Sequence, residues 1–425
     1  MSLEGTSHDP TKTEISDWSY VSEGGATMVF SYVGAPHPVF SHSVIRVRKA
    51  PLNKRDLIND IDEEEPDDPS IAFQNEVTAL LIPAIHLPRL ESVHVTREWL
   101  NELSISAQSK RPELRKAADD IDLSRRKAVI ATDLVGGKGW AVEIKPKWAF
   151  LPNPAYLSSE TRESKMNNCR FCMHSIHKTA GGETAAVGYC PLDLFSGEEG
   201  RVSKALLCLW RSWVEKDGNI NNLKIFVGGS LIKPEQALRQ LAPLLGQPDA
   251  TDINALFPAF NQKLLPLLTQ TKLLSIMAGL QRTLDALDLE GLSRLWKIRQ
   301  GGESPLGTGL TNPSMEEWVA FVKEYIATNQ GRDYSAVPLE SMSSEQMRFF
   351  IMSYLMSTTF KDCSVILRVG SDVPNSITAI DLDPKQIDRL HNWELQDRDI
   401  VANFQESVAE GWVKKDPCVD AGSSQ

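Results

Sequence analysis

Two aspartates, Asp362 and Asp381, stand at the ends of predicted strands, where a carboxylate can serve phosphate chemistry. Asp381 follows the apolar run of residues 376–380, and Asp362 directly precedes the run of residues 363–369. A carboxylate at a strand end is a frequent Mg²⁺ ligand in nucleotide sites. A carboxylate at the mouth of a strand can also accept a proton from an attacking hydroxyl. The pattern predicts a magnesium ligand at Asp381 and a general base at Asp362, with a helix or strand cap as the alternative role for Asp362.

The segment after Asp381 adds side chains that can hold an anion. Pro384 is well placed as a first helical residue, and Lys385, Arg389 and Trp393 then recur every four residues. Residues spaced by four lie on one face of a helix. The spacing predicts a phosphate-binding helix face beside the metal ligand, and a solvated amphipathic helix is the alternative.

Glu143, Lys145 and Lys147 alternate in the segment EIKPK. Alternate residues of an extended chain share one face, so both lysines point to the same side. Two lysines on one face repel each other unless an anion or Glu143 lies between them. Pro146 confines the segment to an edge or an end of a strand. The segment predicts the wall of a functional site, with a solvated edge strand as the alternative.

A glycine turn, Gly24-Gly25, separates two predicted strands and is followed by Ala26 and Thr27. Glycines in a hairpin turn let the backbone approach a ligand closely and present N–H groups to phosphates. Arg46, on the next predicted strand, could reach the same phosphates. Together they predict a nucleotide-phosphate site. The alternative is a plain hairpin turn and an exposed arginine at a strand end, which would give the same sequence pattern.

One segment carries both thiols and basic residues. A CxxC pair with a third cysteine nearby can bind Zn²⁺, and the candidates are Cys169, Cys172 and Cys190. A single CxxC pair does not decide the matter, since four-ligand sites usually show two pairs. The alternative is a cationic helix face made by residues spaced by four: Arg170, His174 and Lys178.

The elements that must position these residues fall into two groups. Alternating apolar residues predict strands within residues 17–49, 127–134 and 139–152, and a helix over 70–84. Beyond them the chain is mainly helical, with two late strands at 363–369 and 376–383. Helices are expected near residues 201–216, 234–246, 253–300 with a break, 315–329 and 343–360. We predict an α/β (α+β) fold with a strand-rich N-terminal lobe (1–135), a hinge, and a larger, helix-rich C-terminal lobe (136–425).

Composition limits the classes of partner. The 425 residues are 41% hydrophobic and 24% charged, with a formal net charge of −11. An acidic chain does not favour general nucleic-acid binding, and no apolar run is long enough for a membrane span. Six unevenly placed cysteines do not suit a disulfide scaffold. We expect a protein of the cytoplasm and nucleus with reduced thiols, acting as a monomer and concentrating its basic residues locally.

Several segments together resemble the inositol-pentakisphosphate 2-kinase family. They are EGGA with VIRV, VEIKPKWAFLP, NNCRFCMHSIHK, YCPLDLFSG, NNLKIFVGGSLI, KDCSVILRV and IDLDPK. They occur in the family's order and span about residues 17–400. The resemblance implies a two-lobed kinase, distantly like protein kinases, that uses ATP and Mg²⁺ to phosphorylate the 2-hydroxyl of inositol pentakisphosphate, giving the hexakisphosphate.

The resemblance also implies roles for single residues. Arg46 resembles a nucleotide-phosphate ligand, Lys145 a lysine that reaches toward the transferred phosphate, and Asp133 a residue before the hinge that contacts adenosine. Asp362 resembles the base and Asp381 the Mg²⁺ ligand. The residues that resemble inositol-phosphate ligands, or lie beside them, are Arg115, Lys147, Arg170, His174, Lys178, Asn221, Asn222, Lys385, Arg389 and Trp393.

Two other functions compete with this prediction. A non-catalytic scaffold for inositol polyphosphates would keep the basic residues, but it would have no use for Lys145, Asp362 and Asp381 together. A kinase for another small phosphorylated alcohol would need the nucleotide residues but not both basic faces, at 170–178 and 385–393.

Overall fold

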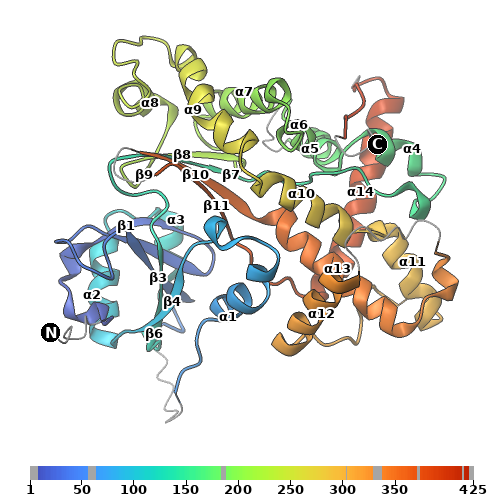
Figure 1. The fold of residues 1–425 in the computed structure, drawn as a ribbon, viewed down its shortest axis with the longest axis horizontal. Coiled ribbons are helices and arrows are strands. Elements are labelled where there is room, and N and C mark those ends of the chain that lie inside the picture. Colours follow the sequence, from blue (N-terminus) through green and yellow to red (C-terminus); the bar gives the residue numbers. More distant parts are fainter. Residues whose placement is uncertain are drawn as a thin grey trace.

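The computed structural model of the chain describes residues 8–55, 64–182, 188–302, 304–328, 337–370, 374–413 and 416–420. Within them, two antiparallel sheets occupy different parts of the molecule, and most of the helices surround the second sheet (Figure 1). This arrangement confirms the predicted α+β fold, with a strand-rich N-terminal part and a larger, helix-rich C-terminal part. The lobe boundary at residue 135 stays a prediction, but the chain passes from one sheet to the other between residues 132 and 139.

The N-terminal sheet has the strand order β1-β2-β3-β6-β4, and β5 pairs with β3. Its strands are β1 (Trp18–Glu23), β2 (Thr27–Tyr32), β3 (Ser43–Pro51), β4 (Leu90–His94), β5 (Asp119–Ile121) and β6 (Lys127–Thr132). Met28 and Phe30 alternate with less buried neighbours along β2, as expected of a strand with one covered face. They join a core with Trp18 and with Trp99 of α2 (Arg97–Ala107), the helix that covers this sheet.

The second sheet has the strand order β11-β10-β7-β8-β9. Its strands are β7 (Gly139–Ile144), β8 (Leu223–Val227), β9 (Ser230–Ile232), β10 (Ser364–Gly370) and β11 (Ser376–Ile380). The central strand β7 pairs Glu143 with Lys224 of β8 on one side and with Ile366 of β10 on the other. Strand ends from distant parts of the sequence therefore lie beside one another at one end of this sheet. Lys145 follows β7, Asp381 follows β11, and Asp362 stands just before β10.

Helices pack around the second sheet and form the largest core (Figure 1). Helix α13 (Ser344–Asp362) is central, because every residue from Phe350 to Lys361 is buried, the polar ones included. It begins at a capping box between Ser343 and Gln346. The other helices of this part are α4 (Arg162–Asn167), α5 (Arg170–Ala180), α6 (Pro191–Leu194), α7 (Glu199–Glu215), α8 (Pro234–Gln240), α9 (Phe257–Thr269), α10 (Leu273–Leu284), α11 (Asp288–Gln300), α12 (Met315–Thr328) and α14 (Leu390–Ala409).

The helix predicted to begin at Pro384 begins later than expected. Residues 382–386 are not helical, a short 3-10 turn covers Ile387–Arg389, and α14 begins only at Leu390. Two contacts hold the segment extended: the Thr359 hydroxyl donates to the Asp383 carbonyl, and the Asn312 side chain accepts from the Ile387 N–H. Lys385 therefore lies outside the helix, whereas Arg389 caps α14 and Trp393 lies in its first turn, so the predicted face of all three residues does not form.

Two short helices complete the N-terminal part, α1 (Pro69–Glu76) and α3 (Glu113–Lys116). Helix α1, predicted over 70–84, ends already at Glu76; it contacts both β4 and α12, and so joins the two parts of the molecule (Figure 1). Among the described residues, no helix combines the length and the apolar character needed to cross a membrane.

Candidate active site

Two neighbouring cavities bring most of the predicted site residues together. The interlobe cavity, about 660 Å³, lies between the sheets and is lined by Gly24, Arg46, Lys145 and Asp381 among others. The cationic cavity, about 410 Å³, lies among the C-terminal helices and is named for the basic residues that line it. Asn221 lines both cavities, so ligands in the two cavities could meet near this residue.

The β1–β2 hairpin covers the interlobe cavity with its glycine turn. The Gly24 N–H donates to the Thr27 carbonyl at 2.9 Å. A side chain added at Gly24 or Gly25 would meet no atom within 4 Å, and neither residue has the left-handed backbone that favours glycine. Beside the turn, Glu23 is buried and ion-paired with Lys49 and Arg111 at 2.9 and 3.0 Å. The protein thus holds the turn firmly but leaves open space in front of it.

Asp381 and Glu143 form an acidic corner of the same cavity. The Ser364 hydroxyl contacts both carboxylates, at 2.9 Å to Glu143 Oε1 and 3.4 Å to Asp381 Oδ2. Burial raises the pKa of Asp381, and Glu143 adds to the rise against the opposing charges of Lys145 and Arg46. Asp381 also has the uncommon backbone φ of +61°. Two crowded carboxylates in a cavity fit a hard divalent cation, which prefers oxygen ligands.

Asp133 belongs to the connection between the sheets. Its carboxylate accepts from the N–H groups of Val135 and Gly136 at 3.0 and 2.7 Å, and from the Ser31 hydroxyl. Arg368 of β10 donates to the carbonyls of Asp133 and Gly136 at 2.9 and 2.8 Å. Asp133 lines the interlobe cavity but is engaged with its own chain, so its contact with adenosine stays a prediction.

The segment between Lys145 and Lys147 is fixed by two buried amides. Asn222 donates to the Lys145 carbonyl at 3.0 Å, and its own carbonyl accepts from the Lys145 N–H. The fully buried Gln281 of α10 bonds to the Lys147 carbonyl, the Ala149 N–H and the Phe360 carbonyl, all within 3.1 Å. Lys147 has a φ of +68°. The two lysines therefore line different cavities, Lys145 the interlobe cavity and Lys147 the cationic one, and the prediction that both point to the same side is wrong.

Asp362 lies at the end of α13, between two lysines. Lys147 Nζ contacts Asp362 Oδ1 at 3.0 Å, and Lys385 Nζ contacts Oδ2 at 3.1 Å. Burial favours the neutral acid, but the two ammonium groups outweigh it and lower the pKa of Asp362 below its ordinary value. About half of the side chain is exposed, so the ionised carboxylate remains accessible in the cationic cavity.

Helix α5 carries basic residues along one face of the cavity, as its sequence predicts. Arg170, His174 and Lys178 all line it. Arg170 Nε donates to Asp397 at 2.5 Å and its guanidinium lies over Trp148, while no described residue accepts from its buried Nη1. An anionic oxygen in the cavity would satisfy that donor.

His174 is not a cation near neutral pH, in contrast to the predicted cationic face. Burial, followed by the charges of Arg170 and Lys178, lowers the pKa of its imidazole from 6.5 to about 3. It can still donate through a neutral ring N–H. The positive charge on this face therefore comes from the arginine and the lysine.

Buried ion pairs form the floor of the cationic cavity. Lys165 of α4 contacts Asp288 and Asp397 at 2.7 Å and Glu290 at 3.1 Å, and these carboxylates raise its pKa well above the ordinary value despite burial. Lys361 contacts Asp285 at 2.5 Å. These lysines are balanced within the protein and hold α4, α11, α13 and α14 together.

The predicted site residues divide between the two cavities. Those lining the interlobe cavity are Gly24, Thr27, Arg46, Arg115, Asp133, Lys145 and Asp381. Those lining the cationic cavity are Lys147, Arg170, His174, Lys178, Asn222, Asp362, Lys385 and Trp393. Of the predicted nucleotide and substrate ligands, Gly25, Ala26 and Arg389 line neither cavity. Contacts of any of these residues with a ligand stay predictions.

Sequence reasoning missed several residues that shape the site. Lys361 directly precedes Asp362, and a lysine at the end of a long apolar helix signals a buried, paired charge. Arg368 stands inside the apolar strand β10, which is the same kind of signal. Lys165 and Gln281 lie in ordinary helical segments and give no such signal.

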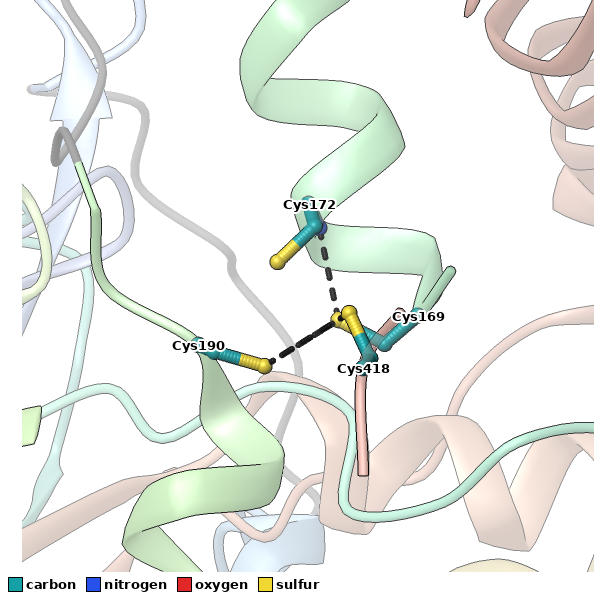
Figure 2. A group of neighbouring side chains, drawn as sticks. All are labelled: Cys169, Cys172, Cys190 and Cys418. Carbon is teal, nitrogen blue, oxygen red and sulfur yellow. Dashed lines mark hydrogen bonds between the residues drawn. The ribbon is translucent and has the colours of Figure 1, made fainter. Parts of the chain in front are cut away.

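The three predicted zinc ligands also lie together. Cys169, Cys172 and Cys190 form one group with a fourth cysteine, Cys418, which sequence spacing did not identify (Figure 2). None of the six cysteines forms a disulfide in this structure.

Comparison with known proteins gives one consistent family. The sequence model described as inositol-pentakisphosphate 2-kinase matches residues 20–399. A protein of that name from Cryptococcus neoformans is 31% identical over 410 residues, covering 91% of this chain and 93% of the relative. One from Arabidopsis thaliana is 31% identical over 249 residues, covering 52% of this chain and 53% of its own. One from Oryza sativa is 25% identical over 461 residues, covering 94% and 96% of the two chains.

Proposed function

The chain belongs to the inositol-pentakisphosphate 2-kinase family and is a kinase, and on that premise we propose the reaction that it catalyses. It transfers the γ-phosphate of ATP to the 2-hydroxyl of inositol 1,3,4,5,6-pentakisphosphate, giving inositol hexakisphosphate and ADP. The observation that carries this proposal is the meeting of the two cavities at Asn221, with Lys145 on one side and Lys147 beside Asp362 on the other.

The interlobe cavity is the proposed nucleotide site. Its open glycine turn leaves room for phosphates to approach the backbone, and Arg46 and Lys145 supply positive charge. Asp381, with Glu143 beside it, would hold Mg²⁺, and when bound the ion would neutralise charge on the β- and γ-phosphates.

The cationic cavity is the proposed inositol-phosphate site. A molecule with five phosphates needs many charge-assisted hydrogen bonds, and Lys147, Arg170, Lys178 and Lys385 line the cavity. The buried lysines of the floor are already paired with carboxylates. The side chains that remain for the ligand are therefore those on α5 and on the two segments around Asp362.

Asp362 is the proposed base. Its lowered pKa keeps the carboxylate ionised near neutral pH, and it can accept the proton of the 2-hydroxyl as the oxygen–phosphorus bond forms. The bond between the γ-phosphorus and the bridging oxygen breaks, and that oxygen leaves with ADP. Lys145 would stabilise the charge on the transferred group, while the protein mainly positions both ligands.

The test is a transfer assay with purified protein, Mg²⁺, ATP and inositol 1,3,4,5,6-pentakisphosphate. We expect hexakisphosphate and ADP in equal amounts, with the new phosphate at position 2 by NMR. Lys385→Ala should lower kcat/KM for the inositol phosphate roughly 10- to 100-fold, the effect of losing one charged hydrogen bond. Lys263→Ala, at an exposed position on α9, is the matched control. Tight binding of the pentakisphosphate without turnover would instead support the scaffold.

A further inference from the structure

A buried ionic network borders the interlobe cavity in the N-terminal part of the molecule. The side chains of Glu23, Lys49 and Arg111 are each 2% exposed or less. A buried charge is costly unless it is paired, so a network in which every charge has its partners holds its members firmly in place. The full network balances three cations against three anions: Lys49, Arg55, Arg111, Glu23, Asp119 and Asp120.

Arg111 has several partners in this network. Its Nε and Nη2 donate to the two carboxylate oxygens of Glu23, both at 3.0 Å, in a two-pronged contact. Nη2 also donates to the Asp119 carbonyl at 2.9 Å, and Nη1 donates to Asp120 at 3.2 Å. A lysine at this position would keep the charge but not the contacts, because a single ammonium group does not match a carboxylate in the manner of the planar guanidinium.

The network holds both ends of the glycine turn. Glu23 is the last residue of β1 and directly precedes Gly24. Lys49 of β3 contacts Glu23 through Nζ at 2.9 Å, and its backbone N–H donates to the Ala26 carbonyl at 2.9 Å. The Tyr20 hydroxyl also donates to Glu23, at 3.2 Å. The carboxylate of Glu23 therefore links the glycine turn to Arg111.

Arg111 also precedes the segment that presents Arg115. Pro112 follows Arg111 directly, and the Pro112 carbonyl accepts from the Arg115 N–H at 3.0 Å where α3 begins. Gly24 and Arg115 both line the interlobe cavity, whereas Arg111 lines neither cavity. The guanidinium of Arg111 thus joins two features of the cavity wall from behind.

We propose that Arg111 is a positioning residue that holds the glycine turn and Arg115 at a fixed spacing in the wall of the interlobe cavity. It acts on the turn through Glu23 and on Arg115 through the chain that follows it. That the turn and Arg115 bind the two ligands rests on the proposed function. Lys145 and Asp381, which would act on the transferred phosphate, follow strands of the second sheet. Loss of the Arg111 contacts should therefore weaken ligand binding more than it slows the transfer.

The first measurement is the kinetics of full-length variants. Arg111→Lys keeps the buried charge but loses the two-pronged contact. It should raise KM for ATP and for inositol pentakisphosphate roughly tenfold, with kcat within about threefold of the wild type. Arg111→Met combined with Glu23→Gln removes one charge of each sign, so the network stays balanced, and it should act in the same way.

The control is Leu103→Ala, which removes part of the buried core under the same sheet and leaves the network intact. It should lower the unfolding temperature without changing either KM. A general loss of stability would move this control together with the Arg111 variants, whereas lost positioning moves the Arg111 variants alone.

The second measurement is hydrogen–deuterium exchange without ligands, which does not depend on phosphate transfer. In Arg111→Lys, the amides of residues 24–27 and 113–116 should exchange faster than in the wild type, and those of β6 should not. Unchanged exchange in both segments would overturn the proposal, and so would unchanged KM values or an equal rise of KM in Leu103→Ala. If the wild type transfers no phosphate, the proposed function fails, and the exchange result still decides the role of Arg111.

Discussion

At the scale of single residues, the cationic cavity combines charged and neutral donors. His174 lies between Arg170 and Lys178 on α5, and burial together with these charges keeps its imidazole neutral. Asp362 shows the opposite effect, because two lysines keep its carboxylate ionised. Each group is thus held in the protonation state that an anion-binding site with a general base requires.

The neutral state of His174 predicts a pH dependence of stability. The unfolded imidazole binds a proton below about pH 6.5, whereas the folded one does so only near pH 3. Because the unfolded state then binds more protons, the free energy of unfolding should fall as the pH drops below 6.5. His174→Gln removes this group. Its urea midpoint should therefore fall less than that of the wild type as the pH is lowered from 7 to 5. A constant difference across that range would contradict the assignment.

Sequence alone identified the residues that end strands, but not those that fix them. Asp362, Asp381 and Lys145 were predicted because strand ends and alternation are local signals. Lys385 was wrongly placed on a helix, since the side chains that hold residues 383–387 extended come from distant segments. Cys418 was missed for the same reason. It is distant in sequence from the other three cysteines, so spacing gives no sign that it lies beside them.

At the scale of elements, Gln281 joins α10 to both sides of the proposed base. Its amide satisfies the Lys147 and Phe360 carbonyls and the Ala149 N–H. Leaving a buried polar group unpaired costs about 1–3 kcal/mol, so Gln281→Leu should destabilise the protein by about 3 kcal/mol or more. Urea unfolding measures this, with Gln262→Leu on the exposed side of α9 as control. Equal stabilities of the two variants would show that the amide does not hold the segment.

The β1–β2 hairpin supports a second prediction. Gly24→Ala should fold with unchanged or slightly higher stability, because no atom obstructs the methyl group and the backbone tolerates alanine. It should nevertheless raise KM for ATP, since the methyl group enters the space reserved for phosphate. Gly200→Ala on α7, equally unobstructed, is the control and should leave KM unchanged. An unchanged KM for ATP in Gly24→Ala would show that the glycine turn is a plain hairpin turn with no part in nucleotide binding.

Most elements were predictable because their signals are periodic. Helices α7, α12 and α13 and strands β6 and β10 lie where apolar spacing placed them, within a few residues, whereas β7 ends at Ile144 and not at residue 152 as predicted. The order of strands in each sheet was not predictable. It depends on pairing between β7 and β10, which are more than 200 residues apart in the chain.

At the scale of the whole molecule, ligand-facing charge comes from both parts of the chain. Lys110 and Arg115 of the N-terminal part line the interlobe cavity, which adjoins the cationic cavity at Asn221. A polyphosphate in the cationic cavity should attract these residues across the gap. Arg368 donates a hydrogen bond to the Asp133 carbonyl in the connection between the two sheets. We expect the two parts of the molecule to rotate about this connection.

We therefore predict that the molecule closes when both ligands bind. Small-angle X-ray scattering should show a smaller radius of gyration with inositol pentakisphosphate and a non-hydrolysable ATP analogue. Arg115→Ala should reduce the change, while Arg239→Ala, at an exposed position on α8, should not. The same radius with and without ligands would show that both cavities are preformed.

The most direct test of the account compares Asp362→Asn with the wild type in both transfer and binding. We predict that kcat falls by about 10²- to 10⁴-fold, the usual contribution of a general base. Calorimetry should show the pentakisphosphate bound at least as tightly, because a negative charge between Lys147 and Lys385 is removed. Turnover within tenfold of the wild type, with binding intact, would contradict the role of Asp362 and with it the proposed site.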